Sequence, residues 1–128
     1  RANSQVHVRN ELVENLEHAL SRMTNEIREA QGVYTPTTTF SQLSLQTRKN
    51  PPAGETSTYV DFFLCGTRLC VKREFQNPQA ITSEKIGIQS LEFTQVQTGT
   101  ASSIRIEVEA SYLTALATMQ ITASLRAY

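Results

Sequence analysis

One amphipathic stripe near the start of the chain limits the fold more than any other feature. Between about Ser4 and Gln31, apolar residues recur every three or four positions, which predicts an α-helix with one apolar face. The stripe consists of Leu12, Leu16, Ala19, Leu20, Met23, Ile27 and Ala30, with Val13 at its edge. The charged residues fall outside it or at its rim: Glu11, Glu14, Glu17, Arg22, Glu26, Arg28 and Glu29. We expect five large side chains to fix the helix to a sheet: Leu12, Leu16, Leu20, Met23 and Ile27.

The two ends of this helix carry different signals. Gly32 directly follows the predicted helix, and a glycine in this place is the usual left-handed stop. Near the other end, Arg9 falls within the angular arc of the apolar stripe, so the apolar face stops near Leu12. The helix is therefore expected to project beyond the body on which it packs.

After Gly32 the apolar period changes from about 3.6 to two, which predicts strands. Six stretches show this pattern: 40–47 with Phe40 at its start, 58–65, 68–74, 85–96, 103–112 and 117–128. The alternation slips at Gln89 and Ser90, which predicts an irregularity there. The stretches RKNPPAGETS and FQNPQAITS are predicted loops. The chain is thus expected to form one α+β domain over residues 1–128, in which a helix (1–32) packs on one face of an antiparallel sheet (33–128).

The pair Cys65 and Cys70 is the sharpest chemical feature of the sequence. If the hairpin loop between strands 58–65 and 68–74 spans four residues, the two cysteines are directly opposed and close to disulfide geometry. If the turn has only two residues, the partners are offset and a bridge would need strain. The alternatives are two small buried apolar side chains or a metal or catalytic pair. The spacing C-x4-C is not the motif C-x-x-C, so a thioredoxin-like redox site has no motif here, and of the alternatives the disulfide is favoured.

Catalytic, metal-binding and nucleic-acid-binding patterns are weak. His7 and His18 are eleven residues apart on the predicted helix, which is about 16 Å along its axis, so they cannot share a metal ion. Glu107 and Glu109 alternate outward beside Arg105, as expected of a solvated face. The net charge is zero and the pI is near 6.9, without a basic patch, so no nucleic-acid partner is expected. We expect no enzyme activity, no cofactor and no metal site; the loop RKNPPAGETS is a possible ligand site, or simply a solvated connector.

The order of these segments resembles the soluble head of a type IV pilin-like protein. The likeness lies in a helix ending in NEIREAQGVYT and in the stretch from Thr82 to Arg126, with ITSEKIGIQSLEFTQV and the terminal ITASLRAY. It is most similar to minor pilins and pseudopilins, whose precursors carry a prepilin-type cleavage and methylation segment. That segment, with its glycine, its apolar helix and its glutamate, is not in this sequence. The cysteine pair also departs from better-known pilins, whose disulfide closes a longer C-terminal loop, so no adhesive loop is assigned here.

The resemblance implies a structural subunit of a type IV pilus or type II secretion-like filament. It implies other pilin subunits and inner-membrane assembly machinery as partners, and contact with the membrane only through an N-terminal helix that lies outside this sequence. The implied location is an extracellular filament or the periplasm, with a membrane anchor before assembly. The alternative is a free-standing secreted or periplasmic α+β module for binding or adhesion, which would use the exposed sheet face or the loop RKNPPAGETS.

Overall fold

The structure is a computed structural model that describes residues 2–35, 38–39, 41–99 and 101–125. One long helix, α1 (Ala2–Glu29), is followed by β-strands only. The strands are β1 (Ala30–Val33), β2 (Leu43–Thr47), β3 (Thr58–Cys65), β4 (Arg68–Arg73), β5 (Gln79–Ala80), β6 (Gly87–Thr98), β7 (Ala101–Tyr112) and β8 (Ala115–Ser124). The α+β class, with one N-terminal helix on antiparallel strands, is confirmed.

The strands form two antiparallel sheets where the sequence predicted one. The larger sheet has the order β1-β2-β3-β4-β5 and the smaller has the order β6-β7-β8. Each of the six predicted stretches contains a strand, although Phe40 lies outside the described residues. The short strands β1 and β5 were missed, because four and two residues are too few to show a period of two.

The prediction for the end of the helix was wrong. The helix ends at Glu29, three residues before Gly32, and the chain enters β1 directly. Gly32 lies beside an irregularity in the pairing of β1 with β2, where the register shifts between Ala30 and Gly32, and it has no left-handed φ. A glycine at a β-bulge and a glycine at a helix stop are both common, so the residue alone did not distinguish them.

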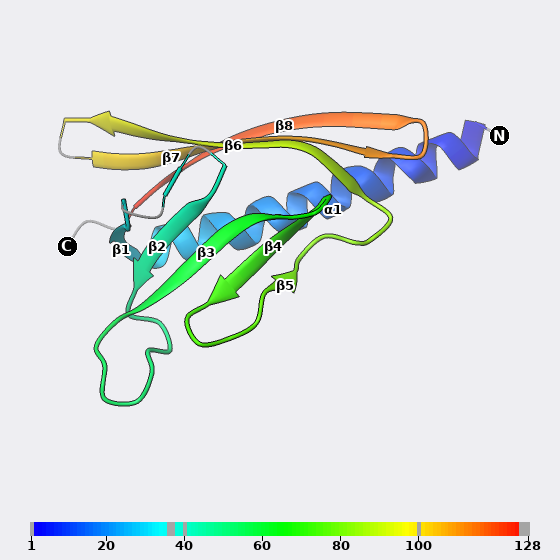
Figure 1. The fold of residues 1–128 in the computed structure, drawn as a ribbon. Helices are drawn as coiled ribbons and strands as arrows, with labels where there is room; N and C mark the ends of the chain where they lie inside the picture. Colours follow the sequence, from blue (N-terminus) through cyan, green and yellow to red (C-terminus); the bar gives the residue numbers. More distant parts are fainter. Residues whose placement is uncertain (1, 36–37, 40, 100, 126–128) are drawn as a thin grey trace.

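The apolar stripe of α1 forms the centre of one continuous core. Leu12, Met23 and Ile27 have no exposed surface, and Leu16 and Leu20 are also buried. Strands of both sheets contribute to the same cluster, with Leu45 and Phe62 from the larger sheet and Ile104 and Ile106 from the smaller. In Figure 1 the smaller sheet lies along the helix on one side and the larger sheet crosses it on another. The helix therefore serves as the shared core element of both sheets.

The first turns of α1 extend past the strands, as the position of Arg9 predicted (Figure 1). Gln5, Val6 and His7 are exposed, and burial becomes continuous along the stripe only from Leu12. The Arg9 guanidinium donates a hydrogen bond from Nη1 to the carbonyl oxygen of Leu116, 3.1 Å away, at the start of β8. This contact marks the place where the helix leaves the body.

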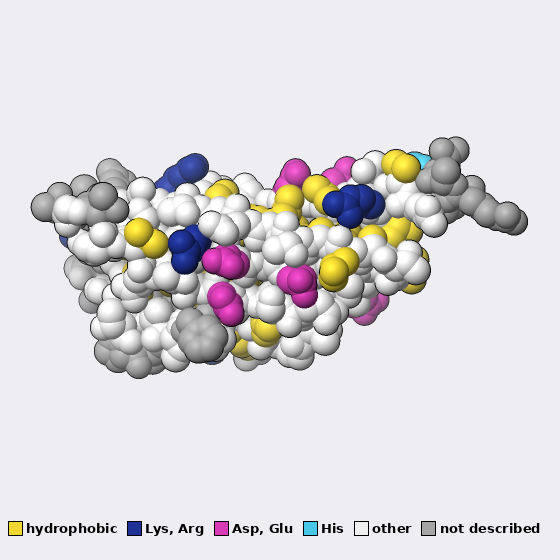
Figure 2. Space-filling model, turned by 90° about the horizontal axis from the view of Figure 1, so that it is seen from above, with side chains coloured by type: hydrophobic (Ala, Val, Ile, Leu, Met, Phe, Trp, Pro, Cys, Tyr) yellow, Lys and Arg dark blue, Asp and Glu magenta, His cyan; other side chains and the backbone are white. Residues whose placement is uncertain are grey.

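The smaller sheet follows its predicted pattern closely. Between Ile88 and Ser90 the register against β7 shifts, which confirms the irregularity predicted at this point. Along β7 the apolar residues Ile104, Ile106, Val108 and Ala110 are buried. The alternate residues form a polar outer face, on which Arg105 Nε lies 3.2 Å from Glu107 Oε1. Figure 2 shows charged side chains spread over this face.

We predict that Leu16→Ala destabilises the domain by about 2–5 kcal/mol, because it removes a fully packed side chain between the helix and the sheets. Chemical denaturation monitored by circular dichroism measures the change. Val6→Ala is the matched control on the same helix, because Val6 is 56% exposed and its truncation should change little. An unchanged midpoint for Leu16→Ala would contradict the packing described here.

Candidate functional site

The cysteine pair lies at the β3–β4 hairpin, at disulfide-bonding distance. The turn between the strands has two residues, Gly66 and Thr67, because Cys65 is opposite Arg68. Cys70 is opposite Phe63, so the two cysteines are diagonal neighbours on one face and not directly opposed. Their Cα atoms are nevertheless 5.9 Å apart, within the usual range for a disulfide. The four-residue loop that would have opposed them does not form, but the pairing does not need it.

The pair connects the two strands close to the turn. Gly66 has a φ of 65°, which is the left-handed conformation that such a tight hairpin requires. Cys70 is buried and Cys65 is half-buried, on the face of the larger sheet that is turned away from the helix. A covalent cross-link at this place restrains the tip of the hairpin. At that tip, Thr67 O accepts a hydrogen bond from Ile88 N of the smaller sheet at 2.8 Å.

A basal patch of exposed apolar side chains lies where the helix leaves the body. We use this name for Val6, Leu113 and Leu116, which are 56%, 75% and 54% exposed. Leu113 occupies the turn between β7 and β8 with a φ of 53°, a conformation that is uncommon for leucine. In Figure 1 this turn lies beside the first half of the helix, and the bond from Arg9 to Leu116 connects the two. Because three large exposed apolar side chains lie on elements at this end of the molecule, this end is a candidate contact surface.

A second candidate site lies between two loops near the other end of the helix. A hollow of about 500 Å³ is lined by Asn50 and Pro52 of the β2–β3 loop, by Thr58 and Arg73, and by Glu74, Phe75 and Gln76 after β4. Phe75 is 79% exposed and has a φ of 65°, and Asn50 has a φ of 53°. The loop RKNPPAGETS, which the sequence singled out, thus supplies one wall of this hollow. Backbone conformations of this kind often occur at ligand sites.

An ion pair that the sequence did not predict joins the helix to the larger sheet. Glu26, which was expected at the rim of the stripe, is buried and pairs with the guanidinium of Arg73. Lys49 Nζ lies 3.9 Å from the same carboxylate and 3.4 Å from Glu29 Oε2. Arg73 is opposite Val60 on the inner face of the sheet, and its side chain reaches Glu26 on the helix from there. The sequence analysis did not predict this burial, because it expected one sheet, whereas two sheets pack on the helix.

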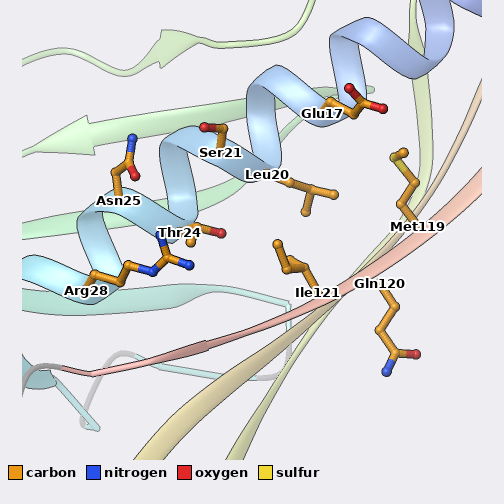
Figure 3. A pocket seen from close by; sticks show the side chains of 9 residues that line it. All are labelled: Glu17, Leu20, Ser21, Thr24, Asn25, Arg28, Met119, Gln120 and Ile121. Carbon is orange, nitrogen blue, oxygen red and sulfur yellow. The ribbon is translucent and has the colours of Figure 1, made fainter.

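A groove runs between α1 and β8 on the opposite side of the helix. Its volume is about 520 Å³, and it is lined by Glu17, Leu20, Ser21, Thr24, Asn25, Arg28, Met119, Gln120 and Ile121. In Figure 3 Leu20 and Ile121 point toward one another, whereas Gln120 points away from the helix. Thr24 is only 4% exposed, and its hydroxyl has no hydrogen-bond partner among the described residues. The groove therefore has an apolar floor and a polar rim.

The remaining candidate residues do not come together in a site. His7 and His18 are both exposed on the helix. Within the described parts of the chain, no group of three or more histidine, cysteine or acidic residues is placed to hold a metal ion. Over the same residues, no helix combines the length and the apolar character needed to cross a membrane.

We predict that the cysteine pair is oxidised in the folded protein and stabilises it by about 2 kcal/mol, as expected for a cross-link that closes a short loop. Alkylation without reductant should add no mass to the intact chain, and alkylation after reduction and unfolding should modify both thiols. The double variant Cys65→Ala and Cys70→Ala should unfold at lower denaturant concentration than the oxidised chain. Reduced wild-type protein is its matched control, and equal stability of its oxidised and reduced forms would contradict the prediction.

We predict that Arg73→Met costs about 3–5 kcal/mol of stability, because it leaves the Glu26 carboxylate buried without its closest partner. The double variant Glu26→Leu and Arg73→Met should recover most of this loss, since it removes both charges. Lys72→Met is the control on the half-exposed outer face of the same strand, and it should change stability by less than about 1 kcal/mol. Equal losses of unfolding free energy in Arg73→Met and Lys72→Met would show that the ion pair of Glu26 and Arg73 does not contribute to stability.

Comparisons of the chain with protein-family models, with curated proteins and with solved structures found no match. The function proposed below therefore rests on the sequence resemblance and on the contacts described above.

Proposed function

We propose that this chain is the head of a structural subunit, a minor pilin or pseudopilin, in a filament of the type IV pilus or type II secretion kind. The subunit would carry a membrane or filament-core helix upstream of α1. The observation that carries the proposal is the end of the molecule at which α1 leaves the body. There, the helix segment with the exposed Val6 lies at the same end of the molecule as the β7–β8 turn, which carries Leu113, and the start of β8, which carries Leu116.

The packing of α1 suits such a role. From Leu12 to Ala30 the stripe is buried against both sheets, so the head is fixed rigidly to this part of the helix. The helix extends past the strands before Arg9, and the residues before Leu12 are mostly exposed, including Val6. A helix held firmly at one end and free at the other can pack against helices of neighbouring subunits without disturbing its own head.

The part of the basal patch outside the helix, Leu113 and Leu116, supports the same proposal. Among the large apolar residues exposed in the described parts of the chain, Val6, Leu113 and Leu116 lie at this end and Phe75 lies elsewhere. Leucine in the left-handed region at a hairpin turn is an unfavourable choice for the turn itself, where asparagine or glycine is preferred. An apolar side chain in this position is explained by a contact with another molecule, such as the next subunit along a filament.

A second function is favoured by the hollow between the two loops. Phe75 presents its ring to solvent beside Asn50, Glu74 and Gln76, whose side chains can form hydrogen bonds with a small ligand. This arrangement suits a secreted or periplasmic binding or adhesion module. It ranks second because the hollow requires no neighbouring subunit and leaves the basal patch without a role.

The test uses two matched variants in the complete natural gene product, expressed in its own cell. Leu113→Asn and Phe75→Asn each remove an exposed apolar side chain at a positive φ, and asparagine tolerates that conformation, so both variants should fold. We predict that Leu113→Asn reduces the amount of subunit in sheared surface or secretion filaments severalfold, whereas Phe75→Asn leaves it unchanged. Immunoblotting of the sheared fraction against the whole-cell fraction measures this.

Two results would contradict the filament proposal. One is normal incorporation of Leu113→Asn together with loss of ligand or cell binding in Phe75→Asn, which would favour the binding module. The other comes from the coding sequence upstream of Arg1. The proposal expects a short leader, a glycine and about 20 apolar residues with a glutamate near their start, and a conventional signal peptide in that place would refute it.

A further inference from the structure

The free edge of β8 is unusual among the strands of this molecule. The ten residues of β8, ALATMQITAS, include no charged residue, no proline and no glycine. Natural edge strands are normally protected by charges, prolines, bulges or short length, because an open edge can pair with another chain. The other edges follow this rule: β1 has four residues and a register shift, and β5 has two residues. β6 carries a register shift and bonds to the larger sheet through Ile88 N and Thr67 O.

The backbone groups on the open side of β8 can be assigned from two hydrogen bonds. Leu125 N donates to Ser102 O on the β7 side at 2.9 Å, and Leu116 O accepts from Arg9 on the opposite side. Because backbone groups alternate along an antiparallel strand, the even-numbered residues direct their N–H and C=O groups to the open edge. For Thr118, Gln120 and Thr122 the described residues supply no partner to these groups. They form an unused row of donors and acceptors.

The groove beside this edge has charges of opposite sign at its two ends. Glu17 and Arg28 are both exposed, and they lie eleven residues apart, or about 16 Å along the helix axis. Between them are Ser21 and the buried Thr24, whose hydroxyl is unpartnered. β8 runs in the same direction as the helix, since Arg9 meets Leu116 at its start and Arg28 lies with Ile121 further along. In Figure 3 Thr24 and Arg28 lie toward β8, whereas Ser21 and Asn25 point to the other side of the helix.

We infer that β8 is the contact strand of a symmetric dimer, in which it pairs antiparallel with β8 of a second copy of this chain. The two small sheets then join into one sheet of six strands. A pairing centred on Gln120 places Thr118 opposite Thr122, so no like charges meet across the strands. The two helices run antiparallel on the same face, and Glu17 of each copy meets Arg28 of the other. Ser21 and Asn25 of the second copy come toward the unpartnered Thr24 hydroxyl.

The occupant is a second copy because the surface is complementary to itself. A twofold axis through the middle of β8 exchanges the two ends of the groove, which carry opposite charges. The inference is independent of the filament proposal. Subunits drawn from one membrane share one orientation, so an antiparallel pair joins heads of separate filaments or free heads, not successive subunits of one filament.

Sedimentation velocity of this chain over a range of concentrations tests the dimer. The wild type should show a concentration-dependent dimer, and Gln120→Lys, which sets two lysines opposite each other, should raise the dissociation constant about tenfold or more. Gln95→Lys adds the same charge at an exposed position on β6, away from the β8 edge, and should leave the dissociation constant unchanged. Equal thermal unfolding of wild type and both variants, measured at a concentration at which all are monomeric, shows that the domain remains folded.

A charge exchange tests the arrangement of the two helices. Glu17→Arg and Arg28→Glu should each weaken the dimer, because each places like charges together at both ends of the groove. The double variant should regain the wild-type dissociation constant to within about threefold, an outcome that misfolding cannot produce. Failure of this recovery would overturn the inference, and so would a dimer that is indifferent to Gln120→Lys. A wild-type chain that stays monomeric up to about 1 mM would also overturn the inference. This holds even if the monomer binds an unrelated extended peptide.

Discussion

Burial of one helical stripe against two sheets is the constraint on which the rest of the structure depends. The inner faces of both sheets pack in one cluster with α1, and β6 of the smaller sheet also contacts β3 and β4 of the larger. Leu16 and Met23 belong to this shared cluster. This arrangement also explains why the helix is firmly held from Leu12 onward and stands free before it. The strands cover only that part of its length.

The two sheets meet the helix on different sides, and the sides differ in chemistry. On the side of the larger sheet, β4 brings Arg73 to the buried Glu26, so an ion pair joins the helix to that sheet. On the side of the smaller sheet the contact is made by Leu20 and Ile121, with a groove left beside them. One flank of the helix packs on the five-stranded sheet, and the other packs on the edge of the three-stranded sheet. The groove lies beside that edge.

The sequence predicted what depends on local period and missed what depends on packing between distant segments. The stripe of α1, the six longer strands and the irregularity at Gln89 all followed from the spacing of apolar residues. The second sheet could not be predicted this way, because strand alternation is the same in one sheet or two. The burial of Glu26 depends on the presence of two sheets around the helix. In the sequence, only the position of Glu26 next to the apolar stripe pointed to this burial. Whether Cys65 and Cys70 are opposed or offset depends on the length of the turn between them. The sequence allowed a turn of two residues or of four, and the structure has two.

The exposed features are consistent with a molecule that has separate surfaces for separate contacts. The basal patch lies where the helix leaves the body, the hollow with Phe75 lies near the helix end joined to Arg73, and the open edge of β8 runs between these ends. Because β8 begins at the basal patch with Leu116, a contact at that end and a contact along β8 meet at one residue. If the proposed contacts form, a neighbour bound at the base would cover the start of the open edge, and it would then compete with pairing through β8.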